Sequence, residues 1–223
     1  MGATEDAIVW LKSTFSTQLN AGVRNTPFDK NLVVAIAMQE TSYLWRGQYK
    51  NRPVGEVLAL CVGDTIDAPR RSAFPRNRAL LEAEPKGKRM FKVARRALED
   101  IAAINGTYAN VARNPDKFCH GFGMFQYDLQ FFKEDPDFFL DRKWATFDGT
   151  LGKCISELKS KLRTTYGANK SSLTHKESVY VAIAYNAGHA NLSKGFKQGF
   201  KDDSGKFYGE KIDEFMKLAE STV

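Results

Sequence analysis

Glu40 is the first residue of this chain whose type and position could do chemistry. Leu32, Ile36 and Glu40 follow one another at helical spacing, which would place the carboxyl group on the apolar side of a helix. Burial disfavours the charged form of a carboxyl group, so such a glutamate can stay protonated near neutral pH and act as a general acid. A glutamate at the end of a helix can equally turn into solvent. This segment alone leaves both interpretations open.

A glycine-led segment, residues 120–128, is the second candidate element. Gly121 and Gly123 permit tight backbone turns and leave room for a ligand to lie against the main chain. Gln126 adds a side chain with both donor and acceptor groups. Because Gly-X-Gly turns are common in hairpins, this segment is weak evidence when it is taken alone.

The third element is an apolar run, residues 182–188, that ends with polar side chains. Tyr185 and Asn186 stand where a core helix would normally carry aliphatic residues. Buried polar groups need hydrogen-bond partners. The hydroxyl of Tyr185 could point toward Glu40 or toward a substrate carbonyl, or both side chains could be satisfied by neighbouring backbone.

Taken together and in this order, the three segments resemble the motifs of the goose-type lysozyme and lytic transglycosylase superfamily, glycoside hydrolase family 23. Glu40-Thr41 corresponds to the family's Glu-Ser motif, residues 123–126 are similar to its Gly-Leu-Met-Gln motif, and residues 184–188 match its Ala-Tyr-Asn-Ala-Gly motif unaltered. The chain departs from the family in three ways. Thr41 replaces the serine, Met-Phe replaces Leu-Met, and the stretch between Glu40 and the glycine-led segment is much longer than in goose-type lysozymes.

The resemblance implies a fold and an activity. The fold would be mainly α and lysozyme-like, with a small β-hairpin region beside the cleft and an enlarged insertion. The activity would be that of a glycosidase that cuts the β-1,4 bonds of peptidoglycan, as a bacteriolytic muramidase does, with Glu40 as the general acid. A chitinase of the same family is the close alternative, and a lytic transglycosylase that gives 1,6-anhydromuramyl products is the next.

A second carboxylate would separate hydrolysis from transglycosylation, because inverting glycosidases use one to activate water and lytic transglycosylases need only the glutamate. Asp128 stands two residues after Gln126, where goose-type lysozymes carry an aspartate and lytic transglycosylases generally do not. We therefore expect hydrolysis with inversion, with Asp128 positioning the water. Asp116 is a weaker candidate for the same role, and either aspartate could be a surface or turn carboxylate.

The resemblance also suggests which residues bind the substrate. The expected set is Thr41, Gly123, Met124, Gln126, Tyr127, Tyr185 and Asn186. Sugar rings present an apolar face, so aromatic side chains near the motifs could line subsites by stacking. These aromatics are Tyr43, Trp45, Phe122, Phe125, Tyr127 and Tyr185. A second aromatic group, Phe131, Phe132, Phe138 and Phe139, is expected in the core.

Periodic apolar residues predict at least six helices that would position these side chains. The helix of Glu40 should begin at Thr26-Pro27, with Thr26 as N-cap, and end near Glu40. Thr174 and Glu177 are spaced as a capping box for a buried helix that runs to Gly188. A further helix should end at Gly167 and a closing one should cover residues 212–219, while residues 105–126 suit turns and a short hairpin.

Length and composition favour one folded domain. With 223 residues and 43% hydrophobic content, the chain can form one core. We expect a single lysozyme-like catalytic domain over residues 1–223, in which about 47–115 form the elaboration, irregular with short helical turns between about 51 and 85. Cys61, Cys119 and Cys154 show no zinc-binding pattern and could hold one disulfide or remain three buried thiols. No metal or other cofactor is expected, and we expect a monomer.

The net charge of +7 favours a polyanionic partner. Basic residues cluster over residues 86–96, but apolar residues at helical spacing in the same run predict a helix with a solvated basic face rather than a dedicated binding patch. We therefore expect a polysaccharide partner, peptidoglycan or chitin, and no nucleic acid. The contrasting class is a non-catalytic module that binds the cell wall or nucleic acid, although no nucleic-acid motif is recognised.

The N-terminal residues lack the pattern of a signal peptide, because Glu5, Asp6 and Lys12 interrupt the apolar positions. No stretch approaches the roughly 20 apolar residues that cross a bilayer. We expect no membrane span and an action outside the cell or in the cell envelope, by an export route that the sequence does not reveal.

Overall fold

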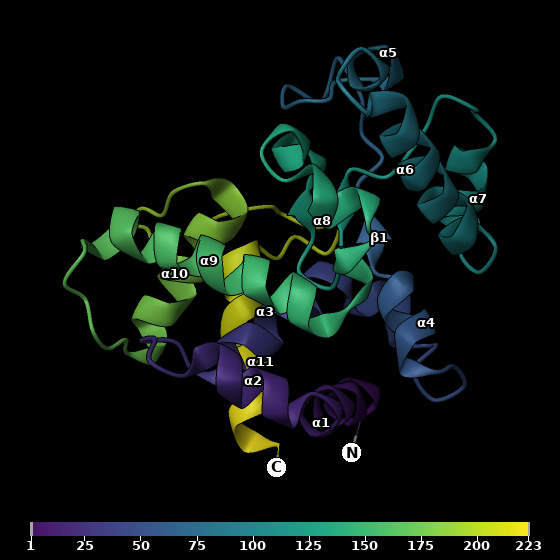
Figure 1. Cartoon of the computed structure of the whole chain (residues 1–223). Helices are drawn as coiled ribbons and strands as arrows, with labels where there is room; N and C mark the ends of the chain where they lie inside the picture. The colour runs from purple at the N-terminus through teal and green to yellow at the C-terminus, as the bar shows by residue number, and fades with distance from the viewer. Residues whose placement is uncertain (1, 223) are drawn as a thin grey trace. The chain divides into compact units, whose positions relative to one another are not determined.

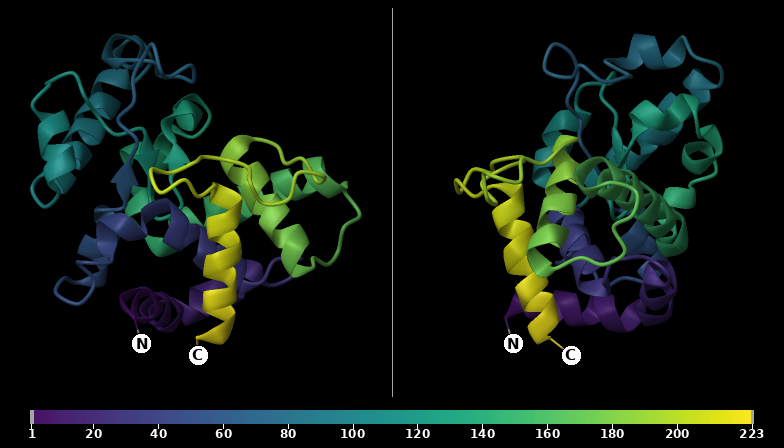
Figure 2. Two further views of the ribbon diagram at one scale, coloured as in Figure 1. Left: turned by 180° about the vertical axis from the view of Figure 1, so that it is seen from behind. Right: turned by 90° about the vertical axis from the view of Figure 1, so that its left-hand side faces the viewer.

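The computed structural model describes residues 2–222 and is mainly helical, as the apolar periodicity predicts, with 59% of residues in helices and 4% in strands (Figures 1 and 2). The contacts between residues divide the chain into two compact units. We call residues 2–42 with 151–222 unit 1, and residues 43–150 unit 2. The expected elaboration lies within unit 2, and the single domain expected over residues 1–223 stays a prediction. Among residues 2–222, no helix is long and apolar enough to cross a membrane.

Unit 1 is built from helices. They are α1 (Ala3–Thr14), α2 (Ser16–Val23), most of α3 (Lys30–Trp45), most of α9 (Phe147–Tyr166), α10 (His175–Ala187) and α11 (Tyr208–Ser221). Every residue from 178 to 184 of α10 is buried, and so is every residue from 32 to 38 of α3. Helix α10 packs against α11, and α1 contacts both α2 and α11. The two most apolar segments of the sequence thus form the core of unit 1.

The ends of these helices test the predicted caps. The capping box of α10 is confirmed, because Thr174 accepts from the Glu177 amide while Glu177 accepts from the Thr174 amide, and Gly188 ends the helix at φ +82°. Gly167, at φ +89°, also ends α9 as predicted. The predicted start of α3 at Thr26 is wrong. The helix begins at Lys30, and the carboxylate of Asp29 caps it by accepting from the Leu32 amide at 2.8 Å.

Apart from the long helix α6 (Gly87–Ala102), unit 2 is built from short helices and strands. In chain order its elements are α4 (Val54–Ala59), β1 (Val62–Gly63), α5 (Arg78–Glu82), α6, α7 (Gly106–Ala112), β2 (Gly121–Phe122), β3 (Tyr127–Asp128), the 3₁₀ helix η1 (Leu129–Lys133), α8 (Pro136–Leu140) and the 3₁₀ helix η2 (Lys143–Ala145). Helix α6 packs against both α5 and α7. It buries Phe91, Ala94, Leu98 and Ile101, the residues whose spacing predicted it.

The small sheet of unit 2 joins the expected hairpin to the elaboration. Strands β2 and β3 form the hairpin, with Gly121 opposite Asp128 and Phe122 opposite Tyr127. Strand β1 pairs antiparallel with β2 and places Gly63 opposite Gly121. Strand β1 could not be predicted from the sequence, because a strand of two residues has no measurable alternation.

An aromatic core lies beside this sheet. Phe132, Phe138 and Phe139 are buried as predicted, and Phe131 packs against them. Three of the aromatics expected at sugar subsites are buried as well, namely Trp45, Phe122 and Phe125. Their assignment to stacking subsites is wrong, because a ring without exposed surface cannot contact a sugar. All three cysteines are buried thiols, and none of them forms a disulfide.

Candidate active site

Glu40 lies inside α3, not at its end, because the helix continues to Trp45. Its side chain is half-buried. Burial raises the pKa of Glu40 from 4.5 to about 7, and a hydrogen bond from Tyr208 offsets part of that rise. A carboxyl group with this pKa is partly protonated at neutral pH, which is the requirement for a general acid.

Tyr208 is the hydrogen-bond partner of Glu40 within unit 1. Its hydroxyl donates to Oε1 of Glu40 at 2.8 Å, and its side chain is only 2% exposed. Tyr208 is the first residue of α11, and its amide donates to the Phe200 carbonyl at 2.7 Å, which fixes the start of the helix. Sequence reasoning missed Tyr208. The available signal was an aromatic residue just before the apolar face of the closing helix.

Cys154 and Tyr185 complete a buried polar cluster in unit 1. Their side chains share a hydrogen bond, and the charge of Glu40 acts on both. Burial, followed by nearby negative charge, raises the pKa of the Tyr185 hydroxyl and of the Cys154 thiol well above their usual values. Both groups therefore stay neutral and can interact with Glu40 as dipoles and not as charges.

Thr41 and Asn186, the other predicted residues of unit 1, have mainly backbone partners. Thr41 is fully buried, and its hydroxyl donates to the Ala37 carbonyl at 3.3 Å. The side-chain oxygen of Asn186 accepts from the Phe200 amide at 3.0 Å, although Asn186 is exposed. Asn186 thus holds the loop that also fixes the start of α11.

The predicted residues around the glycine-led turn lie in unit 2. Gln126 adopts a left-handed backbone at φ +52°, and its side-chain amide donates to the Gly123 carbonyl at 3.0 Å. Its side-chain oxygen lies over the two facing glycines. A Cβ atom added at Gly63 would lie 2.9 Å from this oxygen, and a Cβ atom added at Gly121 would lie closer still. An added side chain on either strand would therefore displace the side-chain amide of Gln126 from this position.

The side chains of two other residues in this segment pack against neighbouring residues. Met124 is fully buried. The ring of Tyr127 stacks on Phe131, with ring centres 4.8 Å apart, and on Phe139 at 5.6 Å. Tyr127 is half-buried, so part of its side chain remains accessible.

Asp128 is held by a buried arginine. The guanidinium of Arg71 donates to Oδ1 of Asp128 at 2.6 Å, and the same oxygen caps η1 by accepting from the Gln130 amide at 2.7 Å. Arg71 is 7% exposed and also pairs with Asp64 at 3.0 Å. Sequence reasoning missed Arg71, because 57 positions separate it from Asp128.

Asp116 has the surroundings of a surface residue. Its side chain is 68% exposed and pairs with Arg78 at 3.0 Å. The two carboxylates considered for the second role therefore differ, since Asp128 is held by a buried arginine and Asp116 has only an exposed ion pair.

The structure thus brings Glu40, Cys154, Tyr185 and Tyr208 together in unit 1, whereas Gln126 and Asp128 belong to unit 2. Comparison of the chain with protein-family models, with curated proteins and with solved structures found no match.

Proposed function

We propose that this chain is a lysozyme-like glycosidase that cleaves the β-1,4 bonds of peptidoglycan, with Glu40 as its general acid. The observation that carries the proposal is the pKa of Glu40, raised to about 7 by burial, next to a tyrosine hydroxyl. A carboxyl group without a cationic partner is costly to withdraw from water, and its presence in the most apolar helix of unit 1 favours a catalytic role over a packing role.

In the proposed reaction, Glu40 donates its proton to the glycosidic oxygen while the bond from that oxygen to the anomeric carbon breaks. The carboxylate left behind accepts the hydrogen bond from Tyr208, which favours the charged form. The buried site strengthens this interaction relative to water. Tyr208 is thus a positioning residue: its hydrogen bond limits the rise of the Glu40 pKa, so that Glu40 can release the proton during the reaction.

For the second half of the reaction, we propose hydrolysis, as the family resemblance implies, with Asp128 orienting the attacking water. Its carboxylate is 26% exposed and held in one orientation by Arg71. Water would add to the anomeric carbon and lose its proton to this carboxylate, so that the configuration inverts.

One observation favours lytic transglycosylation as the second candidate. Both contacts of the Asp128 side chain, from Arg71 and from the Gln130 amide, fall on Oδ1, which is the pattern of a structural cap. If Asp128 has only that role, the C6 hydroxyl of the sugar attacks the anomeric carbon and returns its proton to Glu40. The product is then lighter than the hydrolytic one by one water.

The decisive experiment compares three proteins on purified peptidoglycan. Glu40→Gln should reduce the rate by roughly 10²- to 10⁴-fold, because the amide cannot donate the required proton. Glu134→Gln alters an exposed carboxylate and should leave the rate unchanged. Wild-type cleavage rates for Glu40→Gln would overturn the proposal, and a folded wild-type chain without activity would indicate a wall-binding module.

Product analysis separates the close alternatives. Mass spectrometry of the released muropeptides distinguishes reducing ends from 1,6-anhydro ends. Parallel digestion of a chitin hexamer distinguishes a chitinase from a muramidase, since chitin lacks the lactyl and peptide groups.

A further inference from the structure

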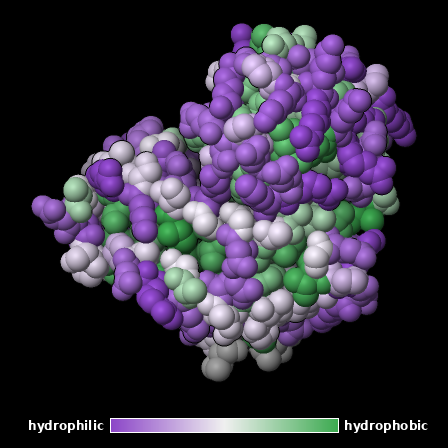
Figure 3. Space-filling view, in the orientation of Figure 1, coloured by the Kyte–Doolittle hydropathy of each residue, from purple (hydrophilic) through white to green (hydrophobic). Residues whose placement is uncertain are grey.

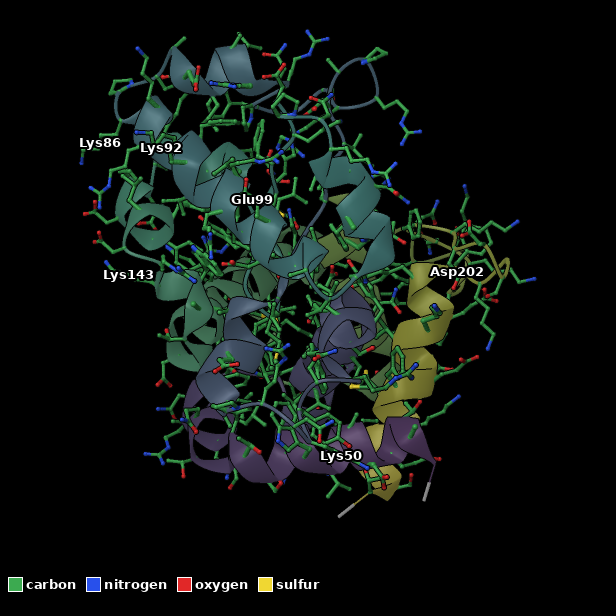
Figure 4. All side chains as sticks on the ribbon, turned by 90° about the vertical axis from the view of Figure 1, so that its right-hand side faces the viewer. Lys50, Lys86, Lys92, Glu99, Lys143 and Asp202 are labelled. Carbon is green, nitrogen blue, oxygen red and sulfur yellow. The ribbon has the colours of Figure 1, made fainter. Side chains whose placement is uncertain are left out.

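Helix α6 and the turn at η2 enclose a hollow of about 230 Å³ on the surface of unit 2. Its cations are Arg89, Lys92 and Arg96 on α6 and Arg142 just before η2. The three residues of α6 follow at intervals of three and four, which places them on one face of the helix. In Figure 4, Lys92 of α6 and Lys143 of η2 lie along the same edge of unit 2.

These cations are available to a ligand. Within residues 2–222, Lys92 and Arg142 have no carboxylate partner, and the carboxylate nearest to Arg89 is that of Asp141 at 3.8 Å. Arg96 pairs with Asp100 at 2.9 Å, but its side chain is 70% exposed. Exposed ion pairs of this kind contribute little and are readily exchanged for another anion.

The floor of the hollow is apolar. Val93, Ala97 and Trp144 line it, and the Arg142 guanidinium lies 5.2 Å from the centre of the Trp144 ring. Trp144 is only 1% exposed, so no aromatic face is open for a nucleic-acid base to stack on. Arg142 holds its position with a left-handed backbone at φ 55°, a conformation that costs a non-glycine residue free energy. Around the hollow, hydrophilic residues cover most of the surface of α5 and α6 in the view of Figure 3.

We propose that this hollow binds a phosphodiester group of an anionic polyol-phosphate polymer attached to the cell wall, an inference that rests on the proposed function. Cations from two separate elements surround a space that accommodates one such group. A phosphodiester carries one negative charge on two non-bridging oxygens of a tetrahedral phosphorus, and in a polymer the neighbouring phosphodiesters supply negative charge for the cations that one group leaves unpaired. Guanidinium groups bind phosphate oxygens in pairs. The apolar floor suits the carbon backbone of a polyol.

The binding test uses insoluble peptidoglycan in two forms. One form keeps its polyol-phosphate polymer, and hydrofluoric acid has removed the polymer from the other. The full chain should sediment with the first form in a salt-sensitive manner and only weakly with the second. Equal binding to both forms would overturn the proposal.

Two double variants and a matched control locate the binding. Lys92→Gln/Arg142→Gln and Arg89→Gln/Arg96→Gln should each weaken binding on the order of tenfold, as expected when charge-assisted hydrogen bonds are lost. Arg76→Gln/Arg113→Gln removes the same charge from exposed positions of unit 2 and should bind as the wild type does. An equal loss of binding in the control variant would show a general charge effect and overturn the assignment of binding to this hollow.

Soluble probes identify the ligand and separate this inference from the proposed function. A synthetic poly(glycerol phosphate) should compete for binding better than a DNA duplex, and tighter binding of the duplex would assign the hollow to nucleic acid. Glu40→Gln should bind the phosphate-bearing form normally, while Lys92→Gln/Arg142→Gln should cleave stripped peptidoglycan at the wild-type rate. Failure of binding and failure of cleavage are therefore seen in different assays.

Discussion

The hydroxyl of Tyr208 donates to the carboxylate of Glu40 at 2.8 Å, although 168 positions of the sequence separate the two residues. The bond joins the first residue of the last helix to the middle of the most apolar one. It lowers the pKa of Glu40 against the stronger effect of burial. Burial thus determines most of the Glu40 pKa, and a residue that lies outside all three motifs adjusts it.

Replacing Tyr208 by phenylalanine tests this relationship. Loss of the hydroxyl removes the contribution that lowers the Glu40 pKa, so that pKa should rise above its value of about 7. Because the general acid must be protonated, the alkaline limb of the kcat/KM profile should move to higher pH. Tyr166→Phe alters a tyrosine of α9 and should leave the limb in place. A limb that stayed still or moved to lower pH in Tyr208→Phe would contradict the assignment.

Glu40 should also make stability depend on pH. Its pKa is higher in the folded protein, about 7, than the ordinary value of 4.5, so its carboxyl group favours the folded state most at low pH. That contribution is complete below 4.5 and is lost as the pH rises through about 7. Glu40→Gln should therefore stabilise the protein at about pH 8, by about 1–3 kcal/mol, and have little effect at about pH 4. Urea unfolding at both pH values measures this, and equal stability of the two proteins at about pH 8 would rule it out.

His175 provides a second pH dependence within unit 1. Its ring nitrogens lie 2.7 Å from Asp213 and 3.1 Å from Glu220, so it links α10 to α11. Burial lowers the pKa of His175, but the bonds to these carboxylates raise it above 6.5 overall. The stabilisation is present below that value and is lost as the pH rises through the raised pKa.

The variant His175→Gln should remove this dependence. Its unfolding free energy should fall below that of the wild type at about pH 5.5 and approach it at about pH 8.5. His189→Gln, at an exposed position, is the control. A stability difference that grew toward alkaline pH would contradict the predicted sign.

Gly123→Ala tests the tightest turn of unit 2. Gly123 has φ +79°, and an added Cβ would lie 2.9 Å from the Cβ of Thr150 and 3.0 Å from the Trp144 carbonyl oxygen. Strain and overlap together should lower the free energy of unfolding by about 2 kcal/mol or more. Gly152→Ala, in the open interior of α9, should instead raise it by about 1 kcal/mol. Urea unfolding curves of the two variants should therefore shift in opposite directions.

Local signals in the sequence predicted the features that depend on neighbouring residues. The capping box at Thr174 and the helical stop at Gly188 follow from the chemistry of a single turn. The cap of α3 was misplaced because Thr26 and Asp29 are both good capping residues, and only Asp29 bonds the third residue of the helix. The aromatic rings at Trp45, Phe122 and Phe125 were misassigned because residue type cannot distinguish a core ring from an exposed one.

Features that depend on distant residues could not be predicted. Tyr208 and Arg71 have no local pattern that marks them as partners of Glu40 and Asp128. Each contact depends on tertiary packing, which brings together residues that no spacing rule connects. Glu40 could thus be proposed as a general acid from the sequence, whereas Tyr208 and Arg71, which contact Glu40 and Asp128, required the structure.

Because Gln126 lies over both Gly63 and Gly121, the elaboration takes part in the packing of the turn segment. The surface beneath Gln126 is formed by one glycine from the turn segment and one from a strand that only the elaboration supplies. A shortened chain without residues 47–115 would lose that strand and expose the backbone edge of β2. Within unit 2, residues 47–115 therefore supply a strand that pairs with the turn segment, so that a substitution on either strand acts on the packing of Gln126.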